Sequence, residues 1–380
     1  MSDRWPLIDA LRGFALFGVV VSNAAVISGA GRVAGPASPF DAILGEAGTY
    51  LIAGKFLALF SLLFGISFGL YLAQPAAAGA SHAVRYLRRM LVLLLMGAAH
   101  QVLAGTDILM TYALFGAVLL LFRNAPGAAL LLGAALALLL PTLWSALIEW
   151  SGYQMPPPPM SRAEQLRLAI EGPYLDLVSV RARMLTRFWN EIPRESSYLT
   201  LFLLGLWSAR RGVLVRPEEH RGLLRALWWG GLGLTAVCYA AQSVLRPALG
   251  GGSQWLGITF GIVWQSTTFI QAITYGAGIS LLWLRGGSLR SSIARLGPGG
   301  QMALTNYLSV SILGTLLIAS THAYGDVSLA VAFSCGAALW MLQLAWSTWW
   351  LRRHERGPFE QLWRTLASAR WMTSSMRIPQ

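Results

Sequence analysis

The chain has 380 residues, of which 55% are hydrophobic and 12% are charged. Soluble domains carry about twice that charged fraction, so the composition excludes an ordinary soluble globular protein. The formal net charge of +13 would suggest nucleic acid binding in a soluble chain, but no basic run with interleaved aromatic residues is present, and we expect no nucleic-acid partner.

Apolar runs of roughly 20 residues, the length that crosses a bilayer, recur along the whole sequence. They predict an all-α fold, a polytopic membrane helix bundle of about ten transmembrane helices. The spans are expected near residues 8–29, 49–74, 88–104, 107–123, 127–147, 198–214, 223–245, 256–284, 300–320 and 328–350. The third and fourth spans are joined only by LAGTD and should form a tight helical hairpin.

Arginine sets the expected orientation of the bundle. With the N-terminus inside, the inner connections hold most of the arginines, so both termini are predicted to be cytoplasmic. The external segment contains a polyproline piece at 155–159 and then amphipathic helices, the first with a capping box of Ser161 and Glu164. Three regions are therefore expected: a five-helix half over 1–147, the external segment over 148–197, and a second five-helix half with a cytoplasmic tail helix over 198–380.

The first two spans carry four polar residues of interest. Asp9 and Arg12 lie three residues apart, so they share one helix face and can pair. This pair either anchors the helix at the inner boundary or binds a phosphate, which the guanidinium fork suits. Asn23, at the outer end of the same helix, could bond to another helix or position a substrate. Lys55, in the outer part of the second span, could snorkel or donate to a substrate.

A histidine and an aspartate occur at the outer ends of the third and fourth spans, His100 and Asp107. Ionisable groups inside a membrane are costly unless they are paired or face water. The two could therefore form a hydrogen bond that fixes the hairpin, or a general base whose imidazole is oriented by a carboxylate. Proton-coupled transporters use the same residue types, so this pair alone does not separate an enzyme from a transporter.

Further polar residues are expected at the inner boundary. Arg88 and Arg89 are chiefly topology determinants and, as a second interpretation, could grip phosphates. Asn306 lies near the inner end of the ninth span. Glu360 and Arg364 are four residues apart on the tail helix, a favourable spacing for pairing. That helix either packs under the bundle or closes an inner site.

Two other features predict no site of their own. The glycine-rich LGPGGQ at 296–301 reads as a loop and matches no phosphate-binding fingerprint, since no strand precedes it. Cys238 and Cys335 lie in apolar helices as small core residues, and no cluster with metal-ligand spacing is present.

Four stretches together resemble the YeiB family of bacterial inner-membrane proteins, over nearly the whole chain. They are RWPLIDALRGFALFGVVVSN, GKFLALFSLLFGISFGL, the block RYLRRMLVLLLMGAAHQVLAGTDILMTYALFG, and MALTNYLSVS with GPFEQLWR. The last pair resembles that family's C-terminal domain of unknown function. The resemblance implies a multi-pass protein of the bacterial inner, or plasma, membrane. Members of the family are often labelled as transporters.

The family is in turn similar to the transmembrane acyltransferases, which include the lysosomal heparan-α-glucosaminide N-acetyltransferase. Those enzymes take an acyl group from cytosolic acyl-CoA and place it on an acceptor across the membrane. The shared signature is Asp9, Arg12, Gly13 and Asn23. The lysosomal enzyme has a functional histidine shortly after its first helix, whereas residues 24–48 contain none. His100, the one histidine predicted inside a span, is therefore our substitute for that base.

The resemblance implies an acyl-CoA-dependent acyltransferase with two polar layers and no metal. An inner layer would receive acyl-CoA, and an outer layer would handle an unidentified acceptor, a glycan, lipid or small molecule. The inner layer would contain Asp9, Arg12, Arg88, Arg89, Asn306, Glu360 and Arg364; the outer layer would contain Asn23, Lys55, His100 and Asp107.

Two alternatives and the oligomeric state stay open. The first alternative is a proton-coupled transporter of a small solute, which discontinuous helices near the midplane would favour. The second is a non-catalytic membrane scaffold. The expected partners are the lipid bilayer and acyl-CoA, and the chain could act as a monomer or a homodimer.

Overall fold

The computed structural model describes residues 5–31, 38–74, 82–153, 157, 160–249 and 254–368, and all regular structure in these ranges is helical. The first half of the chain contributes α1 (Pro6–Ser28), α2 (Pro39–Ala47), α3 (Lys55–Ala73), α4 (His82–Ala104), α5 (Leu109–Leu119) and α6 (Gly127–Ser151). The middle contributes α7 (Arg162–Glu171), α8 (Tyr174–Met184) and α9 (Phe188–Glu195). The rest contributes α10 (Tyr198–Arg211), α11 (Arg221–Ala248), α12 (Gln254–Leu284), α13 (Gly287–Ala294), α14 (Gly297–Gln301), α15 (Ala303–Thr321), α16 (Leu329–Leu351) and α17 (Pro358–Ser368).

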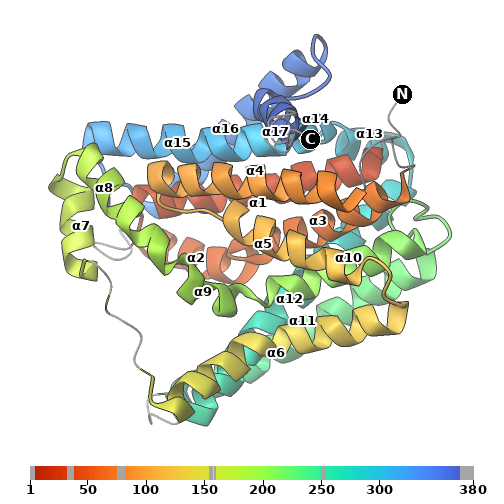
Figure 1. Cartoon of the computed structure of the whole chain (residues 1–380), viewed down its shortest axis with the longest axis horizontal. Helices are drawn as coiled ribbons and strands as arrows, with labels where there is room; N and C mark the ends of the chain where they lie inside the picture. The colour runs from red at the N-terminus through yellow and green to blue at the C-terminus, as the bar shows by residue number, and fades with distance from the viewer. Residues whose placement is uncertain are drawn as a thin grey trace, which may run out of the picture.

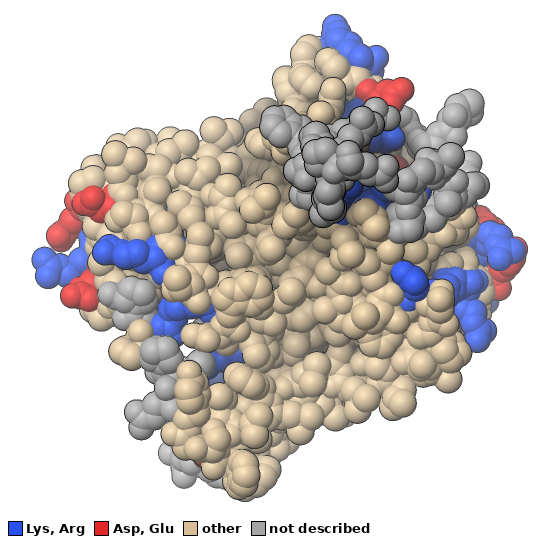
Figure 2. Space-filling model, in the orientation of Figure 1, with Lys and Arg blue, Asp and Glu red and all other residues tan. Residues whose placement is uncertain are grey.

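The helices form a polytopic bundle, as the apolar runs predicted. Within the described residues, eight helical segments are long and apolar enough to cross a membrane, and Leu109–Phe122 is a shorter apolar helix. Figure 1 shows α7 and α8 at one end of the bundle and α13 at the other. In Figure 2 charged side chains gather at these two ends and on the projection at the top of the view, and the surface between the two ends is largely uncharged. This distribution is the one that a bilayer requires of a multi-pass protein.

Glycines let the two halves of the chain interlock. A Cβ on Gly65 of α3 would lie 2.1 Å from the carbonyl oxygen of Phe202 in α10. A Cβ on Gly205 of α10 would lie 2.2 Å from the carbonyl oxygen of Leu62 in α3. Small residues allow such backbone approach between membrane helices, where apolar burial gives little driving force. The short α10 is thereby held against α3 at the centre of the bundle.

The first helix is held in the same way by α14. A Cβ on Gly13 would meet the carbonyl oxygen of Leu296 at 2.1 Å, and a Cβ on Gly300 would meet that of Asp9 at 2.0 Å. The stretch 296–301 is therefore not the loop that its glycines indicated. Gly297–Gln301 forms the short helix α14, with Pro298 near its start, and its glycines permit close packing on α1.

The second expected span is interrupted near its outer end. After α2, a π-helical turn covers Gly48–Ile52, and Gly54, with φ 79°, precedes α3. A positive φ is costly for residues other than glycine, so Gly54 allows the chain to change direction there. Since α3 alone, with 19 residues, is about 28 Å long, this break lies near the membrane boundary and not at the midplane.

The segment predicted to be external packs against the ends of transmembrane helices, with α8 in contact with α4 and α15. The capping box predicted at the start of α7 is present, with Ser161 and Glu164 each bonding the other's backbone. Arg181 of α8 donates to the carbonyl oxygen of Leu103, in the last turn of α4, at 2.7 Å. The predicted polyproline piece at 155–159 lies outside the described residues except for residue 157.

Candidate functional site

A cavity of about 280 Å³ lies between α1, α3, α4, α5, α14, α15 and α17. We call it the inner cavity, because the arginine distribution predicts that this end of the bundle faces the cytoplasm. Most of its lining is apolar, and its polar side chains are Arg12, Ser67, Tyr112, Gln301, Tyr307 and Glu360. Such a space, apolar with a few converging polar groups, is typical of small-molecule sites.

Arg12 is the cation of this cavity. Its guanidinium donates to Asp9 Oδ1 at 2.9 Å and to Ser67 Oγ at 2.5 Å. Gln301 Nε2 in turn donates to Asp9 Oδ2 at 3.1 Å. The predicted pairing of Asp9 with Arg12 is present. Asp9, itself bonded to Gln301, holds the guanidinium of Arg12 in position. The Arg12 side chain stays 26% exposed and lines the cavity.

Glu360 and Thr305 join the tail helix to α15 by a reciprocal cap. The Glu360 carboxylate accepts from the backbone N–H groups of Leu304 and Thr305, at 2.7 and 3.0 Å, and from Thr305 Oγ1 at 2.5 Å. Thr305 Oγ1 accepts from the backbone N–H of Phe359 at 3.1 Å. Each side chain thus satisfies the free N–H groups at the start of the other's helix. We call this arrangement the α15–α17 clasp.

Burial raises the pKa of Glu360 above its ordinary value, and the hydrogen bonds from Thr305 and Leu304 oppose that shift. Trp363 of the same helix donates to the carbonyl oxygen of Arg89 at 2.8 Å. Because Glu360 and Trp363 both line the inner cavity, the tail helix forms one of its walls.

An outer cavity of about 230 Å³ lies at the other end of the same helices. Its polar lining comprises Ser22, Asn23, Thr106, Asp107, Glu195, Tyr198 and Tyr307. Two carboxylates and an amide therefore converge on one space, which suits a ligand with hydroxyl or amino groups.

His100 and Asp107 meet across the α4–α5 hairpin, as their positions predicted. His100 Nδ1 and Asp107 Oδ1 are 2.8 Å apart, and both side chains are at most 1% exposed. Asp107 Oδ2 accepts from the backbone N–H of Met110, which caps α5. Within the described residues His100 Nε2 has no hydrogen-bond partner, and its ring lies 4.9 Å from that of Tyr307. Asp107 lines the outer cavity while His100 stands behind it.

The inner and outer cavities share one thin wall. Val19, Leu57, Ile108 and Tyr307 line both cavities. Along α1, Arg12 and Asn23 are separated by roughly 16 Å at 1.5 Å per residue, and Val19 lies between them. The two polar layers are therefore separated by side chains that line both cavities, and not by a thick core.

Five other predicted residues lie away from these cavities. Lys55 is buried, donates to the carbonyl oxygen of Thr49 at 2.6 Å, and lies over the Trp264 ring. Asn306 is buried and donates to Ser347 Oγ at 3.0 Å, which ties α15 to α16. The remaining three, Arg88, Arg89 and Arg364, are absent from the lining of both cavities.

The predicted pairing of Glu360 with Arg364 does not form. Among the described residues, no ion pair joins these two side chains. The Glu360 carboxylate turns toward α15, where backbone donors compensate for its burial better than an exposed arginine would.

Sequence reasoning missed Glu195, Ser67 and Gln301. Glu195 lies at the end of α9, accepts a hydrogen bond from Thr111 Oγ1, and lines the outer cavity. The one available signal was an acidic residue directly before an apolar span, in the stretch RESSYLTLFLL. Within the described residues, no group of three or more histidine, cysteine, aspartate or glutamate side chains could hold a metal ion.

Comparisons with known proteins agree with the motifs. Residues 208–370, which contain both partners of the α15–α17 clasp, match the family described as "Protein of unknown function (DUF418)". The chain is 29% identical to "Uncharacterized protein YxaH" of Bacillus subtilis, over 97% of this chain and 96% of that protein. It is 24% identical to "Uncharacterized protein YeiB" of Escherichia coli, over 96% of each chain. No solved structure matches.

Proposed function

Because this chain is a YeiB-like, multi-pass membrane protein with a DUF418 region, we propose that it is an acyltransferase of the bacterial inner membrane. It would move an acyl group from cytosolic acyl-CoA to an acceptor at the external face. The supporting observation is the pair of cavities, one with Arg12 and one with Asp107 and Glu195, which share a single wall.

The inner cavity would receive the donor. Arg12 would donate to a phosphate or to the thioester carbonyl, and Asp9 holds its guanidinium in place. The apolar lining contributed by Leu63, Phe64 and Leu93 would hold the acyl chain. Rotation of Tyr307 and Val19 side chains in the shared wall would bring the thioester carbonyl to the outer cavity.

The outer cavity would supply the base. The acceptor's hydroxyl or amine attacks the thioester carbonyl as its proton passes to the carboxylate–imidazole pair of Asp107 and His100. The C–S bond breaks as the C–O or C–N bond forms. The proton then neutralises the departing thiolate, so that acyl-acceptor and free CoA are the products. Glu195, which also lines this cavity, would orient the acceptor.

The test is reconstitution of the full chain in vesicles with acyl-CoA labelled in the acyl group. We expect the label to appear on an external acceptor. Without an acceptor, we expect slow hydrolysis of the thioester, in which water takes the acceptor's place. Binding of CoA should raise the Tm. His100→Ala and Asp107→Asn should lower turnover at least 100-fold with little effect on the CoA-induced Tm shift. Arg12→Gln should instead diminish that shift.

His220→Ala is the matched control, since His220 lies on the inner side and bonds to the carbonyl oxygen of Arg211. It should leave turnover unchanged. Absence of transfer, of hydrolysis and of any CoA-induced shift in the wild type would contradict the proposal.

The transporter alternative has weaker support. It was tied to discontinuous helices near the midplane, whereas α12 is continuous over 31 residues and the break at Gly54 lies near the membrane boundary. A labelled solute that accumulates in vesicles without CoA would favour this alternative.

A further inference from the structure

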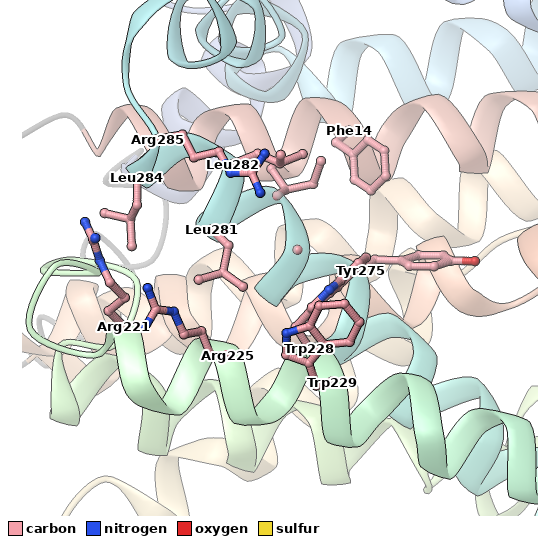
Figure 3. A pocket seen from close by; sticks show the side chains of 12 residues that line it. Phe14, Arg221, Arg225, Trp228, Trp229, Tyr275, Leu281, Leu282, Leu284 and Arg285 are labelled. Carbon is pink, nitrogen blue, oxygen red and sulfur yellow. The ribbon is translucent and has the colours of Figure 1, made fainter.

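A third cavity, of about 620 Å³, opens at the inner end of the bundle between α11 and α12. Its lining combines apolar side chains with Arg221, Arg225, Arg285, Trp228, Trp229 and Tyr275, as Figure 3 shows. It shares no lining residue with the two cavities of the proposed reaction. Its ligand can therefore be considered independently of the acyltransferase proposal.

The cavity exists because α11 and α12 touch closely at one level and leave space beyond it. A Cβ on Gly231 would lie 2.0 Å from Thr274 Oγ1, and a Cβ on Gly278 would lie 2.4 Å from the Trp228 ring. These close contacts lie farther along α11 than Arg221 and Arg225, and the cavity lies next to them.

Three positive charges border this space. Arg221 and Arg225 are four residues apart on α11, hence on one face, and Figure 3 shows both projecting toward α12. Arg285 directly follows the end of α12. Among the described residues none of the three makes a side-chain hydrogen bond or ion pair, whereas Arg216 nearby pairs with Glu219 at 3.1 Å. Three unpaired like charges repel one another and favour a bound anion.

The rest of the lining is apolar and opens toward the membrane. Trp228, Tyr275 and Leu282 form part of it, and Trp229 belongs to it while being 69% exposed. Farther along α11, Leu232 and Leu234 are exposed on the helix, in the zone that hydrocarbon chains cover in a bilayer. Tryptophans at this level are typical of the boundary between headgroups and acyl chains.

We infer that this cavity binds an anionic phospholipid of the inner leaflet, with its phosphate between the three arginines and one acyl chain along Tyr275 and Leu282. Basic pockets between transmembrane helices on the cytoplasmic side suit acidic headgroups, and guanidinium groups bind phosphate through paired hydrogen bonds. A soluble phosphate compound shares the headgroup chemistry, but the apolar part of the cavity fits a lipid.

The test uses the purified full chain in neutral detergent and measures Tm by intrinsic fluorescence. Phosphatidylglycerol should raise Tm, and phosphatidylcholine with the same acyl chains should not. The triple variant Arg221→Gln, Arg225→Gln, Arg285→Gln should weaken the apparent affinity for phosphatidylglycerol at least tenfold. Leu282→Trp, which fills the apolar part and keeps the arginines, should weaken it as well.

The control is a triple variant with the same change in charge, Arg123→Gln, Arg295→Gln, Arg352→Gln, at three exposed arginines outside this cavity. It should keep the full response to phosphatidylglycerol. An equal response to both lipids, or a full response in the cavity variant, overturns the inference. The inference is also overturned if inorganic phosphate or free CoA alone raises the Tm of the wild type and of the control variant but not that of the cavity variant. That outcome would assign the cavity to a soluble ligand.

Discussion

The carboxylate of Glu360 and the hydroxyl of Thr305 show how single side chains can organise two helices. In the described hydrogen bonds, no N-cap side chain of α15 or α17 caps its own helix. Instead, Glu360 of α17 caps α15, and Thr305 of α15 caps α17. Gly357 makes room for this contact, since a Cβ there would lie 2.1 Å from Glu360 Oε2. The motif pair MALTN and GPFEQLW thus has a physical role within the inner end of the bundle.

Loss of the clasp should lower stability measurably. Glu360→Ala leaves two backbone N–H groups of α15 without their partner, and the loss of a cap costs about 1–2 kcal/mol. We expect a Tm several degrees below that of the wild type in thermal unfolding in detergent. Glu355→Ala, which removes an exposed glutamate five residues earlier, should change Tm little. Equal effects of the two substitutions would show that the clasp contributes nothing.

The clasp should also respond to pH in a defined direction. Burial raises the pKa of Glu360, so its stabilising contribution is complete below the ordinary glutamate value and is lost as pH rises through the raised value. Relative to Glu360→Gln, which cannot titrate, the wild type should gain Tm as pH falls from 7.5 toward about 4.5. A relative gain with rising pH would mean that the hydrogen bonds to the ionised carboxylate outweigh its burial.

For contacts between individual side chains, the separation of the two residues along the chain decided whether the sequence could predict them. Asp9 with Arg12 and His100 with Asp107 are three and seven residues apart, so helix geometry and a short hairpin bring them together. Ser67 with Arg12 and Gln301 with Asp9 are separated by 55 and 292 residues. Those contacts depend on how helices pack, which one sequence does not specify. The catalytic and binding roles of all these residues stay predictions.

Among the elements, the crossing of α3 and α10 allows a direct test of the packing. Both Gly65 and Gly205 face a backbone carbonyl of the other helix at a distance that excludes a Cβ. Gly205→Ala should therefore push the helices apart and cost on the order of 1–3 kcal/mol, measured as a lower Tm.

The matched control for this crossing is Gly230→Ala in α11, where a Cβ would meet nothing within 4 Å. Alanine forms helices better than glycine by about 0.5–1 kcal/mol, so Gly230→Ala should leave Tm unchanged or raise it slightly. Similar losses in the two variants would be inconsistent with the close crossing.

The length of the apolar runs predicted the transmembrane helices, whereas the short elements depend on local packing. The ten expected spans correspond to α1, α3, α4, α5, α6, α10, α11, α12, α15 and α16. The helix α14 was mistaken for a loop because its three glycines lower helix propensity, and its packing against α1 outweighs that cost. The break at Gly54 was missed because the apolar run from Leu51 to Leu70 is interrupted only by isolated polar residues, which do not mark a change of direction.

For the whole molecule, the distribution of arginine predicts which end of the bundle faces the cytoplasm. A cysteine in place of Ser179 in α8 should react with an impermeant maleimide in intact cells, in a chain whose Cys238 and Cys335 are replaced. A cysteine in place of Ser288 in α13 should react only after the cells are opened. Both positions are exposed in the structure. The reverse pattern would invert the predicted topology and move Arg12 to the external side.

The wall that α17 gives to the inner cavity has a consequence for the order of synthesis. The ribosome makes Glu360 and Trp363 after every other residue that borders this space. During insertion of the nascent chain, the cavity beside Arg12 therefore lacks one wall until α17 is made. Over the same period, the first backbone N–H groups of α15 lack the acceptor that Glu360 provides. A stop codon shortly before residue 357 would keep the sequence of α1 to α16 yet yield a protein whose inner cavity lacks the wall formed by α17.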